Sequence, residues 1–244
     1  YLRMENDPTQ REELPAQGLL SVQPGGRWGV LTTSDGERFS RSLTNLETRG
    51  TPEETQVLLA PDTPYFNSMG WSPTGEQLAF VGRGAFDDNA GVAGAEIFTI
   101  QPGAAIPRQM TFLTAAYGAA RINGQIDELS WSPDGTRLAF WVIELLGPEL
   151  EGDLGTAVIH TLDVTTGAVT AYCGFATNEH TPHTPRLIWS PDGSTLAFGG
   201  NVEGDNRGYL LLSLNLESGL YTELSEGIFP SFGAPDLIAW GDRP

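Results

Sequence analysis

The decamer WSPDGTRLAF, at Trp131–Phe140, occurs three times with small changes in this chain of 244 residues. The other two copies are WSPTGEQLAF at Trp71–Phe80 and WSPDGSTLAF at Trp189–Phe198. An incomplete copy, DLIAW, lies at Asp236–Trp240, and a divergent early copy, SVQPGGRWGVL, lies at 21–31. The tryptophans recur about every 50 to 60 residues, which is the period of a repeat protein.

Each copy is typical of a β-hairpin. Apolar residues precede the tryptophan, S-P-D-G is a tight-turn sequence, and LAF is a short apolar strand. In the early copy, Pro24 and Gly26 stand where a later copy has Pro73 and Gly75. A second hairpin follows, and its turns DVTTG, NLESG and NLETRG match one another. The repeat unit is therefore four short strands, and no segment has a pattern long enough to predict a helix.

Four-stranded units at this period predict an all-β fold, the β-propeller. A single blade cannot bury both of its faces, so blades stack around an axis and one large aromatic side chain per repeat fills the space between neighbours. We expect a structural role for the repeat residues Trp71, Trp131, Trp189, Trp240, Asp134, Gly135, Asp192 and Gly193.

The W-S-P-D-G motif followed by LAF resembles the WD40-like repeat of TolB-type β-propellers. Residues 131–135 and 189–193 match it fully, and 71–75 departs only at Thr74. The resemblance covers four units and is specific for the fold. The resemblance implies an extracytoplasmic location (periplasmic, cell-surface or secreted). It does not determine one function, because the family includes periplasmic scaffold proteins, propeller domains of peptidases and some lyases.

The two ends of the chain are complementary. Residues 1–14 resemble a second hairpin without a first one, and Asp236–Trp240 is a first strand without a successor. We expect these segments to pair and close the ring, which removes a free sheet edge. The expected blades are 18–62, 63–113, 126–175 and 184–232, with a fifth shared by 234–244 and 1–16. Five blades are predicted, six being common among relatives, and the missing strand is expected in a longer chain upstream of Tyr1.

The charge balance limits the partners. The chain has 31 acidic and 13 basic residues, all arginine, and a net charge of −18. Nucleic acid and anionic lipid are therefore disfavoured, while a protein partner, including a subunit of a membrane complex, is favoured. No segment has the roughly 20 apolar residues that a membrane-spanning helix needs. The single cysteine, Cys173, lies in the apolar run VTAYCGF and is expected to be a buried side chain.

Few residues suggest chemistry. His180 and His183, beside Glu179, have H-x-x-H spacing that could hold a metal ion, although a solvated Thr- and Pro-rich loop explains the same residues. His160 is expected to be a half-buried strand residue. The turns DDNAG at 87–91 and GDNRG at 204–208 could hold Ca²⁺, but turn chemistry accounts for them without a cofactor.

Two long connections are candidate interaction loops. In Leu113–Gln125 we expect Tyr117 and Arg121 to be exposed anchors, and in 144–155 the candidates are Leu146, Glu149 and Leu150. The leading hypothesis is a non-enzymatic scaffold or accessory subunit that binds another protein. The alternative is a metal-assisted hydrolase or lyase, or the propeller domain of one, that uses His180, His183 and Glu179. A glycan or small-ligand binder is a third hypothesis.

Overall fold

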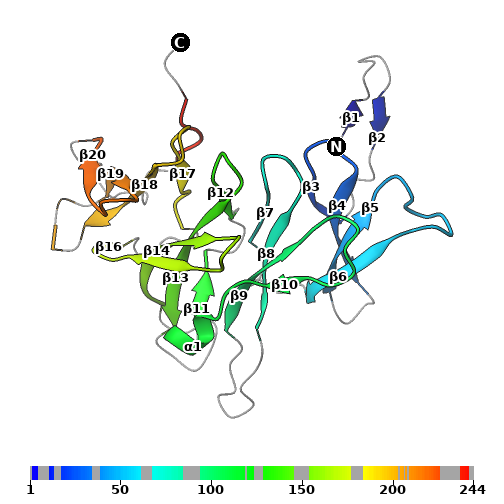
Figure 1. Cartoon of the computed structure of the whole chain (residues 1–244), viewed down its shortest axis with the longest axis horizontal. Helices are drawn as coiled ribbons and strands as arrows, with labels where there is room; N and C mark the ends of the chain where they lie inside the picture. The colour runs from blue at the N-terminus through cyan, green and yellow to red at the C-terminus, as the bar shows by residue number, and fades with distance from the viewer. Residues whose placement is uncertain are drawn as a thin grey trace.

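The computed structural model describes residues 2–4, 11–13, 18–34, 39–61, 68–84, 94–118, 120–123, 129–145, 154–176, 184–202, 204–205, 207, 209–225 and 237–241. Regular structure in these ranges is almost entirely antiparallel β-sheet (Figure 1), which confirms the all-β prediction. The exception there is α1 (Leu113–Tyr117), a helix of five residues that is too short to leave a helical pattern in the sequence.

Four sheets follow one another along the chain, after a separate hairpin of β1 (Leu2–Met4) and β2 (Arg11–Glu13). The first sheet contains β3 (Leu19–Val22), β4 (Trp28–Ser34), β5 (Phe39–Asn45) and β6 (Gln56–Pro61). The second contains β7 (Met69–Trp71), β8 (Leu78–Arg83), β9 (Ala95–Ile100) and β10 (Arg108–Gln109). Each is a four-stranded meander in chain order, as the repeat predicts.

The third and fourth sheets have an interrupted first strand. The third contains β11 (Ala120–Ile122), β12 (Ser130–Trp131), β13 (Arg137–Leu145), β14 (Leu154–Asp163) and β15 (Val169–Tyr172). The fourth contains β16 (Phe175–Ala176), β17 (Ile188–Trp189), β18 (Thr195–Val202), β19 (Leu210–Asn215) and β20 (Tyr221–Glu223). Because β11 and β12 pair with successive parts of β13, and β16 and β17 with successive parts of β18, each pair acts as one edge strand.

The S-P-D-G turns have the geometry that the motif predicts. The Gly135 N–H donates to the Ser132 carbonyl at 2.9 Å, and Gly135 has φ 69°. The Ser132 hydroxyl donates to Asp134 Oδ1 at 2.6 Å, and Asp134 also accepts the Thr136 N–H. These bonds, the one from Ser132 foremost, hold the pKa of Asp134 below its usual range. The turn at 190–193 repeats the pattern, and there the bonds lower the pKa of Asp192 to about 2.

The early copy folds in the same way. The Gly26 N–H donates to the Gln23 carbonyl at 2.8 Å, and the Gln23 N–H donates to the Trp28 carbonyl at 2.9 Å. The Gln23 side chain then donates to the carbonyl of Gly75, in the next turn, at 2.7 Å. The predicted match of Pro24 and Gly26 to the later copies is therefore confirmed, and successive turns contact one another across the sheets.

Two of the repeat tryptophans, Trp131 and Trp189, connect their sheet to the one before, whereas the buried Trp71 Nε1 has no hydrogen-bond partner. Trp131 Nε1 donates to the Gly70 carbonyl at 2.9 Å, and Trp189 Nε1 donates to the Ser130 carbonyl at 3.1 Å. In both cases the acceptor is the residue before the preceding repeat's tryptophan. The guanidinium of Arg137 also lies 5.0 Å from the Trp189 ring centre. Their expected place between neighbouring sheets is therefore observed for Trp131 and Trp189.

Thr74 breaks the motif in the second sheet, and restoring aspartate should stabilise the protein. The Thr74 hydroxyl accepts the Glu76 N–H at 3.4 Å, a longer bond than the equivalent one to Asp134. We expect Thr74→Asp to raise the Tm by about 2–4 °C at pH 7, measured by differential scanning calorimetry. Thr74→Ala is the control and should leave the Tm within about 1 °C. Because the new carboxylate gains bonds, its folded pKa is depressed, so the gain should vanish as the pH falls through that pKa; a gain that persists at pH 2 would contradict the mechanism.

The four sheets lie side by side in chain order, from the blue first sheet to the orange fourth (Figure 1), and shared hydrophobic clusters join sequential neighbours. The predicted ring closure is not confirmed. Within the described residues, β1 and β2 pair only with each other, and 237–241 form no strand. The side chain of Ile238 is 84% exposed, and that of Trp240 is 37% exposed. The blade count of five is likewise not confirmed.

Cys173 is exposed, because it lies at the turn between β15 and β16 and not inside a strand, so the prediction of a buried cysteine was wrong. No helix in the described ranges is long and apolar enough to cross a membrane.

Candidate interaction surface

Helix α1 connects the second sheet to the third and carries an exposed apolar surface. The side chain of Phe112, the N-cap residue, is 69% exposed, and that of Tyr117, the last helical residue, is 44% exposed. Ala115 and Ala116, between them, are also exposed. We call Phe112, Ala115, Ala116 and Tyr117 the α1 surface. A helix of five residues does not persist in water on its own, so contacts with the sheets must hold it.

The N-terminal end of α1 is held by a buried carboxylate of the second sheet. Glu96, on β9, is 2% exposed. Its Oε2 accepts the Leu113 N–H at 2.8 Å and the Thr111 hydroxyl at 2.7 Å, and its Oε1 accepts the Thr114 N–H at 2.8 Å. Glu96 thus caps a helix whose own N-cap residue makes no side-chain cap bond. Leu113, buried, anchors the same turn in the core between the second and third sheets.

The C-terminal end of α1 is held by a buried histidine of the third sheet. His160, on β14, is 1% exposed, so the expectation of a half-buried residue underestimated its burial. Its Nε2 lies 2.8 Å from the Tyr117 hydroxyl, and its Nδ1 lies 3.0 Å from the Val158 carbonyl. The Tyr117 ring meets the imidazole edge to face at 5.4 Å, and the Phe140 ring stacks on it at 5.9 Å. Burial lowers the pKa of His160.

The two contacts together fix α1 in place. Glu96 belongs to the second sheet and His160 to the third, so the helix is attached at both ends to different sheets. Exposed aromatic side chains are frequent energetic anchors of protein interfaces, and they lose less entropy on binding when they are already positioned. The α1 surface therefore offers two aromatic anchors on a short rigid frame.

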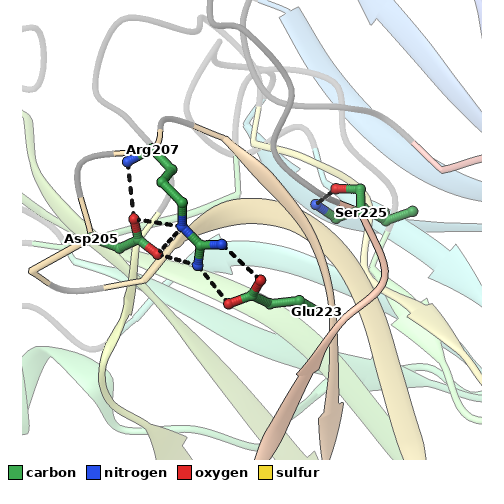
Figure 2. A network of polar contacts seen from close by, with 5 residues as sticks. Asp205, Arg207, Glu223 and Ser225 are labelled. Carbon is green, nitrogen blue, oxygen red and sulfur yellow. Dashed lines mark hydrogen bonds and ion pairs between the residues drawn. The ribbon is translucent and has the colours of Figure 1, made fainter.

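A second polar cluster lies at the edge of the fourth sheet (Figure 2). The Arg207 guanidinium sits between Asp205 and Glu223, with Nε 3.0 Å from Asp205 Oδ1 and NH1 3.0 Å from Glu223 Oε2. Hydrogen bonds from Arg207 hold the pKa values of both carboxyls below their usual range. Arg207 and Glu223 are exposed and Asp205 is partly exposed, and ion pairs in contact with solvent add little stability. Nearby, the Ser225 hydroxyl accepts the Leu211 N–H, which secures the end of β20.

The residues expected to form sites have different outcomes. Tyr117 is partly exposed, on α1, as expected. Arg121 is 8% exposed within β11, so the expectation that it is an exposed anchor was wrong. It is buried because the connection after α1 continues as an edge strand, with Arg121 opposite Ile143. The remaining candidates lie outside the described residues: Leu146, Glu149, Leu150, Glu179, His180, His183 and the turn 87–91.

Metal ligation finds no support in the part of the chain that the structure describes, where no three His, Cys, Asp or Glu side chains gather. Sequence reasoning missed Glu96 and Phe112. Glu96 had one available signal, a carboxylate within the apolar strand AEIFTI, where a charged side chain needs a buried partner. Phe112 had none, because an aromatic residue in a connection is equally compatible with a core position.

Several proteins of known structure align with this chain. TolB from Acinetobacter baumannii aligns over 92% of this chain and 48% of its own, with 18% identity and a TM-score of 0.49. A puromycin hydrolase variant aligns over 93% of this chain and 32% of its own, with 14% identity and a TM-score of 0.52. Prolyl oligopeptidase B from Galerina marginata aligns over 81% and 27%, with 9% identity and a TM-score of 0.51.

The chain is similar in fold to the puromycin hydrolase variant and to prolyl oligopeptidase B, at TM-scores above 0.5. It spans about half the length of the A. baumannii TolB chain and about a third of the puromycin hydrolase chain. No family model matches the sequence, and no curated protein matches it. At identities below 20% in these three cases, the likeness concerns the fold alone and does not determine a function.

Proposed function

We propose that the protein is a non-enzymatic scaffold or accessory subunit of an extracytoplasmic assembly, and that the α1 surface binds a protein partner. The observation that carries the proposal is the pair of exposed aromatic side chains, Phe112 and Tyr117, on a helix held at both ends by buried polar groups. The net charge of −18 favours a partner whose apolar contact site is surrounded by basic residues. The TolB-like fold is consistent with this role and with export.

Site-specific photo-crosslinking tests the proposal. A photo-reactive phenylalanine analogue at position 112 of the native protein should give one crosslinked partner at pH 7.5. The same analogue at Ile106, which is also exposed but precedes β10, is the control and should not capture it. With that partner purified, Phe112→Ala should weaken binding about tenfold or more, while Ile106→Ala should stay within about twofold. Equal capture from both positions, or none from position 112, would refute the α1 surface as the site.

A second candidate function is the propeller part of a longer hydrolase. The likeness to the puromycin hydrolase over 93% of this chain favours it. In that case the catalytic groups would lie on another domain, or would be Glu179, His180 and His183, which are outside the described residues. The intact mass of the native protein separates the two, because a hydrolase would be far longer than 244 residues and would turn over an ester or amide substrate.

Ring closure by Asp236–Trp240 also remains our proposal. The indoles of Trp131 and Trp189 each donate to the residue before the preceding tryptophan, so the next acceptor in the series is the Ile188 carbonyl. Trp240 would be its donor, within a five-bladed ring. Hydrogen exchange tests this: protected amides at 237–240 in the native protein support closure, and amides that exchange at the free-chain rate exclude it.

A further inference from the structure

We infer that the α1 surface is released by acid, because protonation of His160 places a charge in a buried site that gains water when Tyr117 and α1 move away from the third sheet. The inference rests on the proposed function for its biological meaning, since it makes partner binding dependent on pH. The release of α1 itself is a property of the isolated protein and can be measured without a partner.

The hydrogen bonds of His160 fix its proton. The Val158 carbonyl, 3.0 Å from Nδ1, can only accept, so Nδ1 carries the hydrogen. Nε2 is then the acceptor, and the Tyr117 hydroxyl donates to it at 2.8 Å. A second proton on Nε2 would reverse this bond, because the Tyr117 hydroxyl can also accept. It would also charge a ring that is 1% exposed and stacked on Phe140.

No neighbouring charge compensates the imidazolium among the described groups that face it. The titratable group on α1 is Tyr117 itself, and the cross-strand partners are Phe140 on β13 and Ala171 on β15. The charged residues on β11, β13 and β14 are Arg121, Arg137, Glu144 and Asp163. Arg137 and Asp163 lie opposite each other, three positions along the strands from Phe140 and His160. Desolvation is accordingly the leading cause that lowers the pKa of His160.

The sign of the effect follows from this burial. When α1 opens, His160 gains water and its pKa rises toward the ordinary value of 6.5. The open state therefore binds more protons than the closed state at pH values below 6.5, and acid favours opening. Above that pH the imidazole is neutral in both states and Tyr117 stays in place. A partner bound to the α1 surface near neutral pH would be released in a mildly acidic compartment.

Hydrogen exchange of residues 113–118 tests the inference on the full chain. After correction for intrinsic rates, exchange should be about three- to tenfold faster at pH 5.0 than at pH 7.5. His160→Gln keeps an acceptor but cannot be protonated, so its exchange should be the same at both pH values. Tyr221→Phe, which removes a hydroxyl from a tyrosine of similar exposure on β20, is the control and should behave as the native protein does.

Two results would overturn the inference: native exchange that does not change with pH, or His160→Gln exchange that changes as much as the native. If His160→Gln does not fold, Tyr117→Phe replaces it. Without the hydroxyl bond, its α1 should exchange fast already at pH 7.5, with a smaller further increase at pH 5.0. Photo-crosslinking at pH 7.5 tests the proposed function separately from hydrogen exchange. The two experiments therefore distinguish a protein that releases α1 in acid but binds no partner from one that binds a partner but does not release α1.

Discussion

Replacing Trp141 with alanine is expected to lower the free energy of unfolding by about 3–5 kcal/mol. The side chain is 1% exposed, on β13, and lies in the core between the third and fourth sheets. Its ring meets Phe198 edge to face at 5.7 Å, and its Nε1 donates to the Pro185 carbonyl at 2.8 Å. The substitution removes both the ring contact and the hydrogen bond. It leaves a cavity in the core, and the buried Pro185 carbonyl loses its hydrogen-bond donor. Urea unfolding monitored by circular dichroism measures the loss.

Trp240→Ala is the matched control, because the same side chain is removed from a position that is 37% exposed. At the exposure that Trp240 has in the structure, the cost is below about 1 kcal/mol, whereas the proposed ring closure buries the indole and requires a larger loss. A loss close to that of Trp141→Ala would mean that Trp240 is buried in solution, as ring closure requires. A loss below about 1 kcal/mol for Trp141→Ala would contradict the packing between the third and fourth sheets.

The repeat motif was predictable because its bonds are local. Ser132, Asp134 and Gly135 contact one another within a single turn, so their types and spacing determine the geometry wherever they occur. The same is true of Asp163 and Asn215, whose side chains accept N–H groups two and three residues ahead in the second-hairpin turns. Four such units in series determine an all-β fold with little reference to long-range contacts.

The candidate site was predictable only in outline. Tyr117 marked the long connection after β10 as a candidate interaction loop. The residues that hold this connection in place are distant in sequence: Glu96 is 17 residues from Leu113, and His160 is 43 residues from Tyr117. No local pattern encodes such pairs. Arg121 shows the opposite error, since a basic residue in a connection suggests exposure, and only the pairing of β11 with β13 shows that it is buried.

Replacing Glu96 should produce the second large effect, about 3–4 kcal/mol for Glu96→Ala. The Leu113 and Thr114 N–H groups and the Thr111 hydroxyl would lose their acceptor in a buried site. Glu96→Gln keeps one oxygen but turns an amide NH₂ toward groups that donate, so about 2–3 kcal/mol is expected. Urea unfolding gives these values, with the exposed Glu76→Gln as a control that should stay within about 0.5 kcal/mol.

The loss of stability in the Glu96 variants should be local, because Glu96 connects α1 to β9. Hydrogen exchange in the Glu96 variants should increase first in residues 113–118, while the strands of the first and fourth sheets, which do not contact Glu96, keep their protection. The α1 surface would then lose its fixed position, and partner binding should weaken even though Phe112 and Tyr117 are unchanged. A Glu96→Gln variant that matches Glu76→Gln in stability and in α1 exchange would show that the carboxylate is not what holds the helix.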